Sequence, residues 1–300
     1  MKRVLKWTLY GLLSVVGVLG VAAVVLNLLA DRKLARVVKV DVKAVDLPSD
    51  PAALANGRYL FESRGCSECH GGDGKGKVVI DASNGLYVKA PNINPSGAGV
   101  AKYSVEDWIR ALRHGVKPDG RPLLIMPSQD YNRLSDADAG ALIAYAKSLP
   151  AAAGEGAVIR FPFLIKALYA AGVVPDAAEQ IDHTLPPAAA VPVGATVEHG
   201  KYVANMCIGC HGPGLGGGKI PGGPPDWPAA SNLTPGQGSA LVRYENSEKL
   251  RAMFRTSRRP DGSAVSKVMP FQSLRALNDT DVDALYAYLK TVAPRAAGSR

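Results

Sequence analysis

The chain of 300 residues has few aromatic side chains and only four cysteines. Aromatic residues make up 6% of the sequence although 47% of it is hydrophobic, so the large rings that often fill a core are scarce. All four cysteines lie in two short motifs, which leaves no thiol for any other role. The net charge of +9 is not gathered into a basic stripe on a recognised nucleic-acid-binding motif, so we expect no nucleic-acid partner.

Each pair of cysteines belongs to a Cys-x-x-Cys-His motif, once at residues 66–70 and once at residues 207–211. This pentapeptide is the attachment signature of c-type haem. Its thiols form thioethers with the haem vinyl groups, and its histidine supplies the proximal nitrogen to iron. The motifs predict two covalently attached haem c groups, which would also provide the large apolar plates that the core lacks. The predicted attachment residues are Cys66, Cys69, His70, Cys207, Cys210 and His211.

Other uses of paired cysteines explain the pattern less well. A structural zinc site also uses Cys-x-x-Cys, but the two pairs are far apart in the sequence and zinc would leave the following histidines unexplained. A thioredoxin-like redox pair needs a βαβ context, and no such pattern surrounds either motif. A disulfide within each motif, or a chance match, is the remaining alternative, and the specificity of the motif favours haem attachment.

The sequence around the motifs is repeated, which predicts two related domains. The predicted divisions are a membrane anchor and stalk at 1–49, a first domain at 50–150, a linker at 151–194 and a second domain at 195–295. The matching segments are 57–59 with 200–202, 92–95 with 232–235, 118–120 with 260–262, 126–127 with 269–270, and 142–147 with 285–290.

Each domain is predicted to be mostly helical. A middle helix is expected over 105–113 and again over 247–255, and a last helix begins after Ser135 and after Asn278, which are good N-cap residues. Gly57 and Gly200 allow a close approach of the first and last helices, and the tyrosines two residues later are expected to pack in that crossing.

Residues 159–171 form an apolar island in the linker. It is interpreted either as a helix between the domains or as a patch that contacts a membrane or a partner subunit.

Residues 7–30 contain no charged side chain. At ~1.5 Å rise per residue this run forms ~36 Å of helix, enough to cross the ~30 Å hydrocarbon core of a bilayer. A cleavable signal peptide has a shorter apolar stretch and a small-residue cleavage site, whereas this run ends in Leu-Asn-Leu-Leu-Ala. We therefore expect an uncleaved anchor, with a removed signal as the alternative.

The sixth ligand of each iron decides the function, because a closed His/Met pair favours electron transfer and an open face favours catalysis. Met126 and Met269 occupy equivalent repeat positions, and each is followed by a proline that stiffens its loop. We predict that they are the distal ligands. The alternative is that they only fill the core, and the rival ligands are His114, His183 and His199.

With these motifs the chain resembles the class I cytochrome c family, twice over, behind a transmembrane helix. The Cys-x-x-Cys-His motifs, the two Met-Pro pairs and the Leu-Ser-Asp-x-Asp segment at 134–138 carry the resemblance. It implies an all-α fold wrapped around haem, with one haem edge exposed. The chain is similar to dihaem cytochromes of the bacterial cell envelope and to the haem subunits of quinoprotein alcohol and flavoprotein gluconate dehydrogenases, which usually carry three haem domains.

The resemblance also implies a location. Haem is attached to such motifs on the outer side of the bacterial inner membrane, which places the haem domains in the periplasm. The positive-inside count alone indicates the reverse, because more basic residues follow the apolar run than precede it.

The expected function is electron transfer between a dehydrogenase or quinol-linked donor and a respiratory acceptor. The expected partners are therefore a dehydrogenase subunit, another cytochrome or an oxidase, together with the membrane. A subunit that anchors a larger complex is a related possibility. A peroxidase-like dihaem enzyme with one open haem is the alternative, and it would need His114 or His199 in place of a methionine.

A basic run in the second domain could steer an acidic partner, or it could be a solvated helix face. It consists of Arg251, Arg255, Arg258, Arg259 and Lys267.

Overall fold

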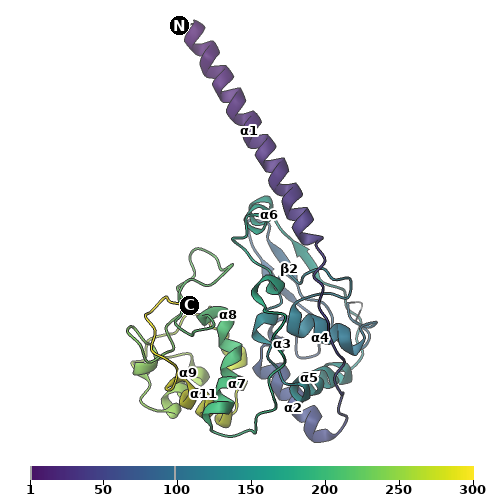
Figure 1. Cartoon of the computed structure of the whole chain (residues 1–300), viewed down its shortest axis with the longest axis vertical. Coiled ribbons are helices and arrows are strands. Elements are labelled where there is room, and N and C mark those ends of the chain that lie inside the picture. The colour runs from purple at the N-terminus through teal and green to yellow at the C-terminus, as the bar shows by residue number, and fades with distance from the viewer. Residues whose placement is uncertain (1, 98) are drawn as a thin grey trace.

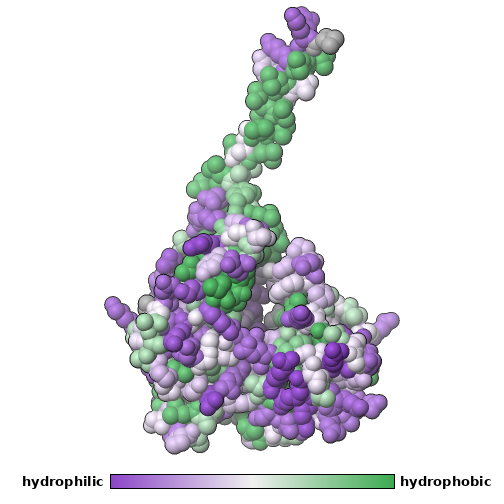
Figure 2. Space-filling view, turned by 180° about the vertical axis from the view of Figure 1, so that it is seen from behind, coloured by the Kyte–Doolittle hydropathy of each residue, from purple (hydrophilic) through white to green (hydrophobic). Residues whose placement is uncertain are grey.

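The computed structural model describes residues 2–97 and 99–300. A long helix, α1 (Lys2–Leu34), stands away from a body made of two lobes (Figure 1). Among the described residues, α1 is the one helix long and apolar enough to cross a membrane, and none of its apolar window is buried inside the protein. Its hydrophobic surface is therefore without a protein partner over that window, as the space-filling view also shows (Figure 2).

The two lobes repeat the same order of helices. The first lobe contains α2 (Pro51–Ser63), α3 (Cys66–His70), α4 (Val105–His114), the 3-10 helix η1 (Ser128–Asp130) and α5 (Asp136–Ser148). The second lobe contains α7 (Val197–Ala204), η3 (Asn205–Cys207), α8 (Ile208–His211), η4 (Leu241–Arg243), α9 (Ser247–Thr256), α10 (Phe271–Ala276) and α11 (Asp279–Leu289). Each lobe buries its own hydrophobic core.

The start signals of the last helices are confirmed. The Ser135 side chain accepts a hydrogen bond from the Asp138 backbone N–H at the start of α5, and Asn278 does the same for Asp281 at the start of α11. Each cap satisfies one of the backbone donors that a helix N-terminus leaves free.

The first and last helices of each lobe cross at a glycine. A Cβ atom on Gly57 would lie 2.1 Å from the carbonyl oxygen of Ala141 in α5, and one on Gly200 would lie 1.9 Å from that of Ala284 in α11. Both distances are far inside van der Waals contact, so only glycine permits this approach.

We predict that Gly57→Ala and Gly200→Ala each lower the free energy of unfolding by about 1–3 kcal/mol, because the crossing helices must separate to admit a methyl group. Chemical denaturation of the full chain measures this. Gly72→Ala is the matched control, because a Cβ there meets nothing within 4 Å. Equal stability of all three variants would contradict the close packing.

The expected all-α class needs one correction, because the structure contains a small antiparallel sheet. Its strands are β1 (Val78–Asp81), β2 (Tyr87–Lys89) and β3 (Val158–Arg160), in the order β1-β2-β3. The run Val78-Val79-Ile80 has the β-branched residues that favour strands, and Asn84-Gly85 in the turn is a strong hairpin signal. This local signal is weaker than the helical pattern of the surrounding sequence, and the chain as a whole is mostly helical.

The linker does not pack between the lobes. Its helix α6 (Phe163–Ala170) lies beside the end of α1 (Figure 1). Its 3-10 helix η2 (Ala177–Gln180) reaches the same end of α1 through the ion pair of Glu179 with Lys33. Lys166 Nζ is 2.9 Å from Asp31 Oδ1 of α1. The interpretation of the apolar island as a helix between the lobes is therefore wrong, because α6 packs against the end of α1, whereas the strand β3 before it pairs with β2.

Candidate haem sites

The first motif forms the short helix α3, and its histidine is held by a backbone carbonyl. His70 Nδ1 lies 3.0 Å from the carbonyl oxygen of Pro91. Because a carbonyl only accepts, Nδ1 carries the hydrogen and the lone pair of Nε2 remains free for a metal. Burial lowers the pKa of His70, which favours the neutral imidazole needed for ligation.

The second motif repeats this arrangement. His211 Nδ1 lies 2.8 Å from the carbonyl oxygen of Ser231, so its Nε2 is again the free nitrogen. Burial lowers the pKa of His211 as well. Pro91 and Ser231 occupy equivalent positions of the repeat, and the two histidines are therefore oriented in the same way.

A buried asparagine directly follows each of the two residues whose carbonyls orient these histidines. Asn92 donates from Nδ2 to the carbonyl of Ala152 over 2.8 Å, and Asn232 donates to that of Arg295 over 2.7 Å. Each asparagine side chain thus ties its loop to the segment after the last helix of the same lobe, and the repeat was the signal that pointed to this shared role.

An apolar cavity of about 100 Å³ opens beside His70. Cys66, His70 and Met126 all line it, together with apolar and aromatic side chains. Trp108 also lines the cavity, and its buried indole Nε1 has no hydrogen-bond partner. An apolar plate with polar carboxylate edges, such as a porphyrin, fits this lining and would supply that partner.

The corresponding residues of the second lobe meet at its core. Cys207 and Met269 both pack against the cluster of buried side chains in this lobe, and His211 ends the helix that begins directly after Cys207. Met269 also borders a more open groove that Glu68 of the first lobe reaches. The structure thus brings Cys66, His70 and Met126 to one cavity, and Cys207 and Met269 to one core.

The three rival histidines have other partners. His114 Nδ1 lies 3.0 Å from Nδ1 of His183, which ties the end of α4 to the linker. His199 lies inside α7 and donates from Nε2 to Asp281 Oδ1 over 2.8 Å. None of the three lines the cavity beside His70.

Two tyrosines join the lobes reciprocally, in a role that the sequence analysis missed. Tyr59 of α2 donates to Asp281 over 2.8 Å and accepts from the Asn278 N–H at the start of α11. Tyr202 of α7 donates to Asp138 over 2.5 Å and accepts from the Ser135 N–H at the start of α5. Each tyrosine thus reaches the other lobe's last helix instead of only filling its own helix crossing. Equivalent residues of the two lobes therefore make equivalent contacts across this interface.

The haem motifs also lie at this interface. The backbone N–H of Gly209, inside the second motif, donates to Asp130 of η1 over 2.8 Å. In the mirror contact, Glu68 of the first motif accepts hydrogen bonds from the backbone and hydroxyl of Ser273 in α10. Asp130 and Ser273 both lie four residues after the predicted methionine ligands. Each motif therefore contacts the loop that follows the other lobe's methionine.

A buried ion pair fixes the centre of the interface. Arg64 of the first lobe lies 3.0 Å from Asp281 of the second, and both side chains are almost fully buried. Burial alone would raise the pKa of Asp281, but the charge of Arg64 and the hydrogen bonds from His199, Tyr59 and Arg64 lower it below its ordinary value. The carboxylate is therefore held ionised between the lobes.

Asp130 is predicted to make stability depend on pH. Burial raises the pKa of Asp130 to about 7, although the hydrogen bond from Gly209 opposes the rise. A carboxyl whose pKa is higher when folded stabilises the protein fully below its unfolded pKa of ~3.9, and this contribution is lost as pH rises through about 7. Asp130→Asn keeps the acceptor and removes the titration.

We expect Asp130→Asn to be more stable than the parent chain at pH 8 by on the order of a few kcal/mol, with little difference at pH 4. Chemical denaturation of both proteins at several pH values measures this. Asp279→Asn, an exposed position, is the control and should leave the pH profile unchanged. Parallel profiles for parent and Asp130→Asn would rule out titration of this carboxyl.

Comparison with known proteins identifies the class of both lobes. Residues 52–145 match the family model described as cytochrome c oxidase, cbb3-type, subunit III, and residues 197–293 match the model described as cytochrome c. The two lobes are cytochrome c domains in tandem, a class that binds haem c covalently.

The more specific likenesses are to cytochrome subunits of dehydrogenases. The chain is 28% identical over 283 residues to the cytochrome c subunit of a quinone alcohol dehydrogenase from Gluconobacter oxydans (strain 621H), covering 81% of this chain and 55% of that protein. It is 27% identical over 286 residues to the gluconate 2-dehydrogenase cytochrome c subunit of Pantoea cypripedii, covering 84% and 62%. A stretch of 101 residues is 37% identical to the fructose dehydrogenase cytochrome subunit of Gluconobacter japonicus, covering 31% and 20%. The chain therefore spans less than two thirds of the length of each of these relatives.

Proposed function

We propose that the protein carries two haem c groups and transfers electrons between a dehydrogenase or quinol-linked donor and a respiratory acceptor. The haems attach through Cys66 and Cys69 and through Cys207 and Cys210. The observation that carries this proposal is the reciprocal contact of the two motifs across one interface, Gly209 with Asp130 and Glu68 with Ser273. It supports a short path for electrons between two redox centres in adjacent domains.

The proposed ligands are His70 with Met126, and His211 with Met269. The haem iron supplies one-electron chemistry when bound. The chain's own residues orient the imidazoles through Pro91 and Ser231 and exclude water from the apolar cavity of the first lobe. Closed His/Met coordination favours electron transfer over catalysis, and this supports a carrier rather than a peroxidase-like enzyme.

The proposed location is the inner membrane of a bacterium, with α1 as a single span and both haem domains in the periplasm. The length and apolar surface of α1 support the span. The periplasmic side of the membrane is supported by the proposed covalent haem, because haem is attached to such motifs on the outer side of the inner membrane. The redox partners are a dehydrogenase subunit, another cytochrome or an oxidase.

Part of the basic run in the second domain is already neutralised within the protein. Arg251 lies 2.5 Å from Asp283, and Arg255 lies 3.4 Å from Asp279. Arg258 and Lys267 instead border the groove beside Met269. These two charges are the ones that support steering of an acidic partner toward the second haem.

Reduction in native membranes tests this function. A quinol or a dehydrogenase substrate is added to membranes that contain the protein, and the absorbance of both haems is followed before and after an oxidant. Reduction of two haems per chain, followed by reoxidation through an acceptor, is the expected result. Haems that no donor in the membrane can reduce would contradict the proposal.

A further inference from the structure

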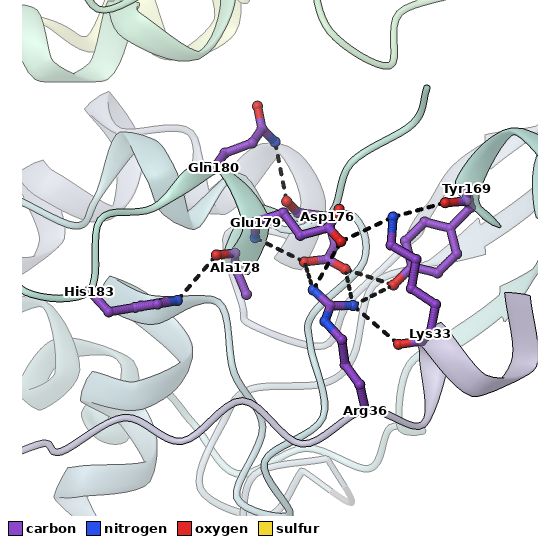
Figure 3. Close-up of polar contacts among 8 residues, drawn as sticks. All are labelled: Lys33, Arg36, Tyr169, Asp176, Ala178, Glu179, Gln180 and His183. Carbon is purple, nitrogen blue, oxygen red and sulfur yellow. Dashed lines mark hydrogen bonds and ion pairs between the residues drawn. The ribbon is translucent and has the colours of Figure 1, made fainter. Parts of the chain in front are cut away.

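A buried polar cluster fastens the linker to the chain segment that follows α1 (Figure 3). We call it the juxtamembrane clamp, and it consists of Lys33, Arg36, Tyr169, Asp176 and Glu179. The Arg36 guanidinium contacts both carboxylate oxygens of Asp176, at 2.7 and 2.8 Å, and Asp176 is 1% exposed. Bidentate pairs of this kind are among the stronger and more directional polar contacts, so the clamp fixes the linker in one position.

Tyr169 is the element of the clamp that belongs to α6. Its hydroxyl donates to Asp176 over 2.6 Å and accepts from Arg36 over 2.9 Å. Its backbone carbonyl accepts from Lys33 Nζ over 2.8 Å. The C-terminal end of α6 is therefore tied to the segment directly after the proposed span.

A second contact lies nearer to the span. Lys166 Nζ lies 2.9 Å from Asp31 Oδ1 and 3.3 Å from Asn27 Oδ1, one helical turn closer to the apolar part of α1. Together with the clamp, this contact holds α6 beside the last turns of α1. These turns carry the first charged residues after residues 7–30, which is where a spanning helix meets the headgroups.

The first turn of α6 presents large apolar side chains to the outside. Phe163 is 50% exposed and Leu164 is 64% exposed, and Leu28 on the adjacent part of α1 is 61% exposed. Figure 2 shows that the apolar surface of α1 continues onto the body where the helix enters it. Lys33, Arg36 and Lys166 lie near this surface, but each is paired with a carboxylate. The exposed apolar side chains are therefore what suits this patch to a membrane surface.

We propose that the first turn of α6, through Phe163 and Leu164, inserts into the headgroup–acyl boundary of the bilayer beside α1. This inference rests on the proposed membrane anchorage of α1. The lipid surface is the occupant that the structure favours, because the apolar patch is continuous with the span and is fixed to it by the clamp. A helix and an inserted turn together make two points of attachment, which sets the orientation of the first cytochrome c domain relative to the membrane.

Depth-dependent fluorescence quenching tests the insertion on the full-length, haem-loaded protein. The four native cysteines are all in haem motifs, so a single introduced cysteine is the only thiol for a fluorescent label once haem is attached. The labelled positions are Leu164→Cys in α6, Leu19→Cys in the span, and Val242→Cys, an exposed residue of the second lobe. The protein is reconstituted into phosphatidylcholine and phosphatidylglycerol vesicles that contain lipids brominated along the acyl chain.

We expect strong quenching of the labels at 19 and 164, with shallow bromines most effective at 164, and no quenching at 242. Quenching at 19 without quenching at 164 would overturn the insertion and leave the anchor intact. No quenching at 19 would overturn the anchor and the insertion together. Adding Asp176→Asn should release α6 and at least halve the quenching at 164 while leaving that at 19 unchanged, and undiminished quenching at 164 would contradict the role of the clamp.

Discussion

Replacing Asp281 by alanine should lower the free energy of unfolding by ~3–5 kcal/mol. The substitution leaves Arg64 as an uncompensated charge at a site where its side chain is 5% exposed. It also removes the acceptor for Tyr59 and His199, and a buried polar group without a partner is costly in itself. Chemical denaturation of the full chain measures the loss.

The matched control is Asp279→Ala, two residues earlier in the same helix. Asp279 contacts Arg251 and Arg255 at 3.3 and 3.4 Å, but its side chain is 62% exposed. Exposed pairs contribute only ~0–1 kcal/mol, so this variant should differ little from the parent chain. A similar loss for both variants would mean that the network around Asp281 does not hold the domains together.

Replacing Met126 by alanine should open one iron of the two. The reduced variant is expected to bind one carbon monoxide per chain, whereas the parent protein binds none. The potential of that haem should fall, because methionine ligation raises it. Redox titration and carbon monoxide difference spectra measure both effects.

Met269→Ala should open the other iron in the same way, and the double variant should bind two carbon monoxide molecules. Met253→Leu is the control, because Met253 is a buried core residue of α9 without a counterpart in the repeat. Its substitution should leave both irons closed. If Met126→Ala and Met269→Ala bound no more carbon monoxide than this control, the methionines would be core residues rather than ligands.

The sequence predicted the parts of the protein that depend on short-range chemistry. Ser135 and Asn278 predicted the starts of the last helices because an N-cap acts within one turn. Gly57 and Gly200 predicted the close helix crossings because only the missing Cβ permits them. The motifs and the repeat predicted two cytochrome c domains, and the family comparisons bear this out.

The contacts between distant segments could not be predicted in the same way. Asp281 occupies the same helix position as Asp138, and nothing in its local sequence shows that it also pairs with Arg64. Tyr59 and Tyr202 lie where a core tyrosine would lie, and only the folded interface reveals that their hydroxyls reach the other lobe. Such pairings depend on the relative placement of whole domains, which local periodicity does not encode.

The position of the linker helix also depends on contacts between distant segments. Its apolar residues predicted a helix, and α6 is present. Its partner is the end of α1 because Asp176 and Arg36 meet there, although 140 residues separate them in the chain.

Near-infrared magnetic circular dichroism of the oxidised protein, combined with carbon monoxide binding after reduction, tests whether both irons have His/Met coordination. We expect a methionine-to-iron charge-transfer band from both haems and no uptake of carbon monoxide. If one haem lacked this band and bound carbon monoxide, its iron would have an open coordination site. That result would contradict His/Met coordination of both irons and would favour a catalytic role for that haem.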